Sequence, residues 1–242
     1  NPRWFGQNST PNGSLNPALG LTGIRLCLAE PVMFRTQMRA ILRAAAHGPV
    51  RMMWPMITSI SEVRQCLIHL DTAQRQLTER GETFGPVSIG CMIEIPSAAM
   101  TVGSILKLVD FISIGTNDLI QYLLSVDRGD DSVGHLYQPG HPAVLKTLQH
   151  IIRTANRMEK GVSICGEMAG DTVFTRLLLG MGLRRFSMNP NNLLSVKNII
   201  LHSHTGHLEN DAAKILRCED PEKTEKLIKI LNQSEQAESH AV

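Results

Sequence analysis

The chain has 242 residues, enough for one large domain or two small ones with a substantial core. Its formal net charge of +2 gives no electrostatic reason to expect nucleic acid or an anionic membrane as a partner, and we expect neither. The apolar runs are far shorter than the roughly 20 residues that cross a bilayer, so we expect no membrane insertion. Five scattered cysteines without a CxxC pair argue against a disulfide framework or a zinc site. With no signal peptide visible, we expect a cytoplasmic protein.

Apolar runs and amphipathic spacing divide the chain into alternating strands and helices. Short apolar runs that end at breakers or polar turns predict five strands, at residues 50–54, 87–93, 110–114, 162–165 and 185–188. Helical spacing predicts helices at residues 31–46, 59–81, 97–108, around 145–160, around 174–178, and at 193–201. Ser59 and Glu62 stand at capping-box spacing, so the second of these helices should begin there.

Five strand–helix units in a row, without a hairpin signal, predict an α/β fold with a parallel sheet wrapped by helices. A complete TIM-type (β/α) barrel needs eight such units, so we expect an incomplete barrel in which about five are present. We expect an irregular segment at 1–15, the partial barrel domain at 16–205, and a polar C-terminal tail at 206–242 with one helix, at about 221–231.

Reactive and acidic side chains stand where three neighbouring strands are predicted to end. Glu94 follows the second strand, Asn117 and Asp118 follow the third, and Cys165 ends the fourth. These ends share one edge of a parallel sheet, where barrels keep their chemistry. Two carboxylates from adjacent strands suit Mg²⁺, which takes one or two carboxylates together with water and substrate oxygens.

Each of these residues also has a purely structural interpretation. Glu94 could be held at a helix N-terminus, Asp118 could be a helix N-cap, and Cys165 could be an inert thiol that closes a buried strand. Arg128, in a Gly/Asp-rich loop, could bind a phosphate or carboxylate, or form a solvated ion pair. The pattern at three strand ends together favours the metal-site interpretation.

Several motifs in order resemble the phosphoenolpyruvate (PEP)-utilising enzymes. They are Glu94-Ile95-Pro96, Gly115-Thr116-Asn117-Asp118-Leu119, Asp127-Arg128-Gly129 and Cys165-Gly166-Glu167-Met168-Ala169-Gly170-Asp171. Within that family the chain is most similar to the C-terminal PEP-binding domain of enzyme I (phosphoenolpyruvate-protein phosphotransferase) of the bacterial phosphotransferase system. The resemblance covers about residues 16 to 203.

The resemblance implies a barrel that binds PEP and passes its phosphoryl group to a histidine on a separate domain, from which a phosphocarrier protein receives it. Glu94 and Asp118 would hold Mg²⁺, Asn117 and Arg128 would bind the substrate, and Cys165 would protonate the enolate to release pyruvate. The family's domain also forms dimers, so a homodimer is expected.

The chain departs from the family at the motif Asn-Pro-x-Leu-Gly-x-Arg-x-x-Arg. Thr22 stands in place of the first arginine, and Arg25 occupies the second position. The upstream strands with further arginines have no counterpart in residues 1–15, and an arginine-to-threonine change removes a bidentate phosphate contact. Three functions therefore stay open: an impaired enzyme I-type catalytic domain, a non-catalytic dimerisation or ligand-sensing remnant, and a metal-dependent enolate lyase.

Overall fold

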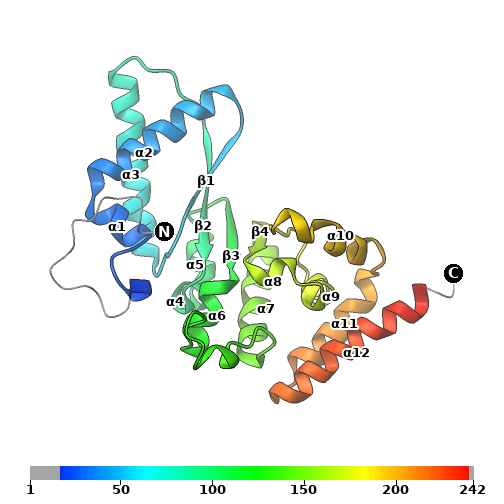
Figure 1. Ribbon diagram of the computed structural model, residues 1–242. Coiled ribbons are helices and arrows are strands. Elements are labelled where there is room, and N and C mark those ends of the chain that lie inside the picture. The colour runs from blue at the N-terminus through cyan, green and yellow to red at the C-terminus, as the bar shows by residue number, and fades with distance from the viewer. Residues whose placement is uncertain (1–16, 240–242) are drawn as a thin grey trace.

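Four parallel strands form the centre of the computed structural model, which describes residues 17–239 (Figure 1). They are β1 (Val50–Trp54), β2 (Val87–Ile93), β3 (Phe111–Gly115) and β4 (Gly161–Cys165), and they pair in that order. Parallel neighbours need long crossover connections, which helices provide here. The first four predicted strands are confirmed, each to within one residue at either end.

Helices precede, connect and follow the four strands. They are α1 (Ile24–Ala29), α2 (Pro31–Ala44), α3 (Ile60–Glu79), α4 (Pro96–Met100), α5 (Val102–Ile105), α6 (Thr116–Leu124), α7 (Pro142–Arg157), α8 (Glu167–Gly170), α9 (Thr172–Gly180), α10 (Leu193–Leu201), α11 (Thr205–Leu216) and α12 (Pro221–Ser239). Figure 1 shows α2 and α3 together at one side of the strands, and α11 and α12 together at the other. Within residues 17–239, no helix combines the length and apolarity needed to cross a bilayer.

The predicted capping box opens α3. The Glu62 carboxylate accepts hydrogen bonds from the backbone N–H of Thr58 at 2.6 Å and of Ser59 at 3.1 Å. These bonds satisfy donors that a helix N-terminus leaves unpaired, which fixes where α3 begins.

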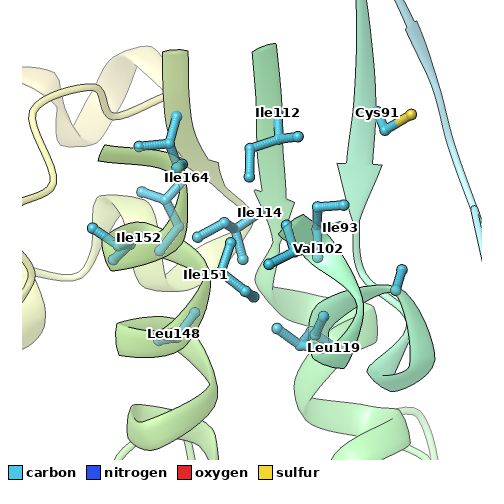
Figure 2. Packing of buried hydrophobic residues seen from close by; sticks show 14 of the residues in the cluster. Cys91, Ile93, Val102, Ile112, Ile114, Leu119, Leu148, Ile151, Ile152 and Ile164 are labelled. Carbon is cyan, nitrogen blue, oxygen red and sulfur yellow. The ribbon is translucent and has the colours of Figure 1, made fainter. Parts of the chain in front are cut away.

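The two faces of the sheet differ in chemistry. The outer face presents isoleucines of β2, β3 and β4 to the helices, and Figure 2 shows Ile114 and Ile164 close to Ile151 and Ile152 of α7. Complete burial of each such side chain contributes about 1.5–3 kcal/mol. Alternate residues point to the other face, which we call the inner face because it would line a closed barrel. This face carries the polar and small residues Arg51, Ser88, Gly90, Ser113, Gly115, Ser163 and Cys165.

The fifth predicted strand, Arg185–Met188, is reduced to a single parallel bridge between Ile164 and Phe186. Its pairing consists of the bonds Ile164 N–H to Arg185 O at 3.1 Å and Ser187 N–H to Ile164 O at 2.9 Å. The extended segment cannot grow because Asn189 caps a 3₁₀ turn that begins at Pro190. The described residues therefore contain four strands and one bridge, where a complete barrel has eight strands.

Two further expectations on helices were wrong. The helix predicted at 97–108 is broken at Thr101 into α4 and α5, and the Thr101 hydroxyl donates to the carbonyl of Ser97 at 2.8 Å. The segment after residue 205 contains two helices rather than one, because α11 buries Leu208 and Ile215 against its neighbours in an otherwise polar stretch. The irregular segment predicted at 1–15 lies outside the described residues.

Candidate functional site

The carboxyl ends of β2, β3 and β4 bring the predicted site residues to one edge of the sheet. Glu94 directly follows β2, and Asn117 and Asp118 lie in the first turn of α6, which begins where β3 ends. Cys165 is the last residue of β4 and pairs with Gly115 of β3. Because parallel strands run in one direction, these side chains meet although they are far apart in the sequence.

Glu94 is a buried carboxylate, with 4% of the residue exposed. Its Oε1 accepts the backbone N–H of Met56 at 2.6 Å, and Met56 adopts the left-handed conformation with φ 58°. A non-glycine residue in that region is strained, and such strain concentrates at functional sites. The Glu94 side chain lies over Gly115, where a Cβ would stand 2.8 Å from Oε2.

The pKa of Glu94 is raised to about 7, chiefly because burial disfavours the charged form; the Met56 N–H lowers it, and the neighbouring Asp118 carboxylate raises it. Two like charges at close range disfavour each other unless a cation lies between them. In the described part of the chain, no three His, Cys, Asp or Glu side chains cluster so as to hold a metal without other ligands. A pair of carboxylates with remaining positions for water and substrate fits Mg²⁺, which needs no more than that from the protein.

The Cys165 thiol sits against the third strand. Its Sγ lies 3.4 Å from the carbonyl oxygen of Ile114 and 3.6 Å from the Ser113 hydroxyl. Burial raises the pKa of this thiol, the Ser113 hydroxyl lowers it, and the carboxylates of Glu94 and Asp118 raise it again. The thiol is therefore protonated at neutral pH and can donate a proton.

Asn117 and Arg128 are linked through Glu167, which follows Cys165 by two residues. The Asn117 Oδ1 accepts the backbone N–H of Glu167 at 2.9 Å, and the Arg128 guanidinium donates to the Glu167 carboxylate at 3.0 Å. Gly166 has φ 91°, and a Cβ there would stand 2.7 Å from the Asn117 Oδ1. Only glycine allows the turn that carries Glu167 to Asn117.

Sequence reasoning did not single out Glu167 or Tyr137 as site residues. Tyr137 donates its hydroxyl to the Asn117 carbonyl at 3.4 Å, and burial raises its pKa to about 12. With Glu167 it lines a cavity of about 190 Å³ beside the Arg128–Glu167 pair. Glu167 belongs to the Cys165 motif that carries the resemblance, but nothing in the spacing of the two residues shows that they contact Asn117 and Arg128.

The segment that contains Thr22 lies beside the same edge. The Tyr122 hydroxyl donates to the Ala18 carbonyl at 2.8 Å. Burial raises the pKa of Tyr122, the Asp118 and Glu94 carboxylates raise it further, and Arg25 lowers it. The Arg25 guanidinium donates to the carbonyl of Leu19 at 2.8 Å. Arg25 is therefore a second cation near the carboxylates, although it is engaged with its own segment.

The family model of the PEP-utilising enzyme, PEP-binding domain, matches residues 9–205. A phosphoenolpyruvate-protein phosphotransferase of Cupriavidus necator is 55% identical over 210 residues, which are 86% of this chain and 36% of the relative. One of Bacillus subtilis is 40% identical over 216 residues, or 89% of this chain and 38% of the relative.

The crystal structure of a citrate lyase from Burkholderia xenovorans LB400 has a TM-score of 0.50 at 18% identity, over 84% of this chain and 69% of that one. At this identity the likeness concerns the fold, and it supports the incomplete (β/α) TIM-type barrel. The chain spans about a third of the length of the curated relatives it matches. Because the family model covers most of its residues, this chain belongs to the PEP-utilising enzymes and carries their PEP-binding domain.

Proposed function

We propose that this chain is the catalytic domain of an enzyme I-type phosphoenolpyruvate-protein phosphotransferase. It binds PEP and Mg²⁺, and its substrate's phosphoryl group passes to a histidine on a separate domain, with release of pyruvate. The observation that carries the proposal is the meeting of the Glu94–Asp118 carboxylate pair with the protonated thiol of Cys165 at one edge of the sheet.

Glu94 and Asp118 hold the Mg²⁺ in this proposal. When bound, the ion supplies positive charge that offsets the charge developing on the substrate's enolate oxygen. The Met56 N–H fixes the Glu94 carboxylate, so the pair is oriented before the ion arrives.

Asn117 and Arg128 bind the substrate. The Asn117 amide oxygen is engaged by the Glu167 N–H, which leaves the amide N–H groups as donors to a carboxylate or phosphate oxygen. Arg128 is paired with Glu167 across an exposed contact that is worth at most about 1 kcal/mol, so an anionic substrate can take its place.

Cys165 is the acid that completes the reaction. Loss of the phosphoryl group leaves the enolate of pyruvate, whose C3 takes the thiol proton as the C=O bond of pyruvate forms. The thiol becomes a thiolate and is reprotonated from solvent. A raised pKa favours this role, because the thiol must carry its proton until C3 accepts it.

The exchange of pyruvate methyl protons in D₂O tests the proposal without the separate histidine domain. With Mg²⁺ present, we expect the chain to accelerate loss of the methyl proton NMR signal, and Cys165→Ala to abolish the acceleration. Cys218→Ala, which removes a thiol far along the chain from the site, should leave it unchanged. Equal rates for the parent and Cys165→Ala would reject Cys165 as the acid.

The resemblance also extends the proposal to the partners. We place the protein in the cytoplasm as a homodimer, with a phosphocarrier protein receiving the phosphoryl group from the histidine domain. A non-catalytic dimerisation or ligand-sensing role is the second candidate, because Thr22 stands where the family pattern has an arginine. The Cys165 motif resembles that of the PEP-utilising enzymes and argues against an enolate lyase, and the likeness to citrate lyase supports a common fold only.

A further inference from the structure

The amino-terminal end of the inner face holds two arginines. Arg51 belongs to β1, and Arg185 lies in the segment that bridges to β4. Gly161, near Arg185, is four residues before Cys165 on β4, which places these arginines about 13 Å from the candidate active site along the strand. They are therefore separate from the site at the carboxyl edge.

Three residues on neighbouring strands form the surface, here called the floor, next to the two arginines. Gly90, Phe111 and Gly161 are in register on β2, β3 and β4. The Phe111 ring lies across Gly90, where a Cβ would stand 2.4 Å from the ring. The Arg51 guanidinium carbon lies 3.6 Å from the centroid of that ring. Gly90 is required here, since any side chain would displace the ring on which Arg51 stacks.

Both guanidinium groups reach toward Gly161. A Cβ at this position would stand 2.7 Å from Arg185 Nη1 and 3.8 Å from Arg51 Nη2. Two positive groups thus lie within 4 Å of one point, above a residue that has no side chain. The absence of a side chain at Gly161 therefore allows both guanidinium groups to approach the same part of β4.

Neither arginine has a counterion among the side chains that the structure describes. The ion pairs and side-chain hydrogen bonds of those residues include neither Arg51 nor Arg185. Two adjacent cations repel each other, and a single anion between them converts that repulsion into two attractions. Guanidinium groups present paired N–H donors that match the oxygens of a phosphate or carboxylate.

We propose that Arg51 and Arg185 form a binding site for one oxyanion, a phosphate or a carboxylate group, on the floor made by Gly90, Phe111 and Gly161. The anion comes from one of two sources: a free phosphate in solution, or an aspartate or glutamate side chain of a second copy that packs on the inner face. The site does not depend on the proposed catalytic function.

Inorganic phosphate is the probe for this site. We expect phosphate to raise the melting temperature of the parent chain more than sodium chloride of equal ionic strength does. In Arg185→Gln the apparent dissociation constant for phosphate should be at least tenfold higher. Arg64→Gln is the matched control, since Arg64 is an exposed arginine on α3, and it should respond as the parent does. Equal responses of the parent and Arg185→Gln to phosphate, in both melting temperature and sedimentation, would overturn the proposal.

Arg185→Glu tests the site without an added ligand. A carboxylate at position 185 supplies the missing counterion to Arg51, so this variant should melt at a higher temperature than the parent in phosphate-free buffer and lose the response to phosphate. A lower melting temperature together with an undiminished phosphate response would contradict the proposal.

Sedimentation velocity distinguishes the two sources. If phosphate stabilises the parent equally at all protein concentrations and leaves its sedimentation unchanged, the site takes a free anion. If phosphate dissociates an oligomer that Arg185→Gln also fails to form, the site takes a carboxylate of a second copy. Each result identifies the same pair of arginines as the receptor.

Discussion

Burial and the neighbouring Asp118 carboxylate both disfavour the charged form of Glu94. Its pKa in the folded chain, about 7, is above that of an unfolded glutamate, so folding favours the protonated form. The stability that Glu94 contributes is therefore complete below the unfolded pKa and is lost as the pH rises through 7. A metal ion that binds the Glu94 carboxylate would offset this loss of stability.

Glu94→Gln should accordingly stabilise the metal-free chain. At pH 8 in EDTA we expect its free energy of unfolding to exceed that of the parent by about 1–2 kcal/mol, allowing for partial solvent screening. At pH 5 the two should be nearly equal. Urea unfolding at both pH values measures the difference, with the exposed Glu209→Gln as control. A variant less stable than the parent at pH 8 would show that the charge is not disfavoured.

Cys165 should react slowly with iodoacetamide at neutral pH, since only the thiolate is alkylated. Because burial and the nearby carboxylates raise its pKa, we expect its alkylation rate to reach half of the plateau at a pH above that of a free thiol. Mass spectrometry of the peptide that contains Cys165 follows the rate. Rapid, pH-independent alkylation near pH 7 would mean a thiolate, which could not act as the proton donor.

For single residues, the sequence predicted which side chains lie together at the site but not which hydrogen bonds position them. Glu94, Asp118 and Cys165 were recognisable because each ends or follows a strand, and parallel strands bring such positions together. Arg128 was recognisable only through the family motif. The position of Glu167 beside Asn117 depends on the turn at Gly166. The hydrogen bond from the Met56 N–H to Glu94 depends on the left-handed conformation of Met56. Neither conformation has a local signal strong enough to read from one sequence.

Among the helices, α11 packs closely against α9, whereas the sequence predicted a polar tail for this segment. Gly180, the last residue of α9, lies so close to α11 that a Cβ would stand 2.4 Å from the Leu208 carbonyl oxygen. Gly180→Ala should therefore cost about 1–3 kcal/mol, because the two helices would have to separate. Thermal unfolding measures the loss.

Gly206→Ala provides the matched control, because no atom lies within 4 Å of a Cβ at that position and the residue lies in the first turn of α11. We expect this variant to be as stable as the parent or slightly more stable. If Gly180→Ala were equally harmless, α11 would not be packed as closely on α9 as the structure has it.

The strands were predictable because breakers bound them: Pro49 and Pro55 flank the first, and polar turns follow the others. α11 was missed because its buried positions, Leu208, Ala212 and Ile215, are few and separated by charged residues. Arg185–Met188 has the composition of a strand, but the 3₁₀ turn that Asn189 caps ends the extended segment, which pairs with β4 through a single bridge.

Residues 17–239 together form a partial barrel with open edges. Within residues 17–239, β1 pairs only with β2, so its other edge presents unpaired backbone groups. Such an edge favours pairing with another chain. We therefore expect the isolated chain to be oligomeric or poorly soluble in light scattering. A monodisperse monomer over a range of concentrations would contradict this expectation.

Calorimetric titration of PEP into the chain with Mg²⁺ tests the central claim most directly, namely that this partial barrel retains the substrate site. We expect saturable binding that EDTA and Asn117→Ala abolish, and that Thr22→Arg tightens about tenfold, as a regained charged contact of about 1.5–3 kcal/mol would allow. Absence of binding to both the parent and Thr22→Arg would mean that Glu94, Asp118, Asn117 and Arg128 do not form a PEP site in this chain.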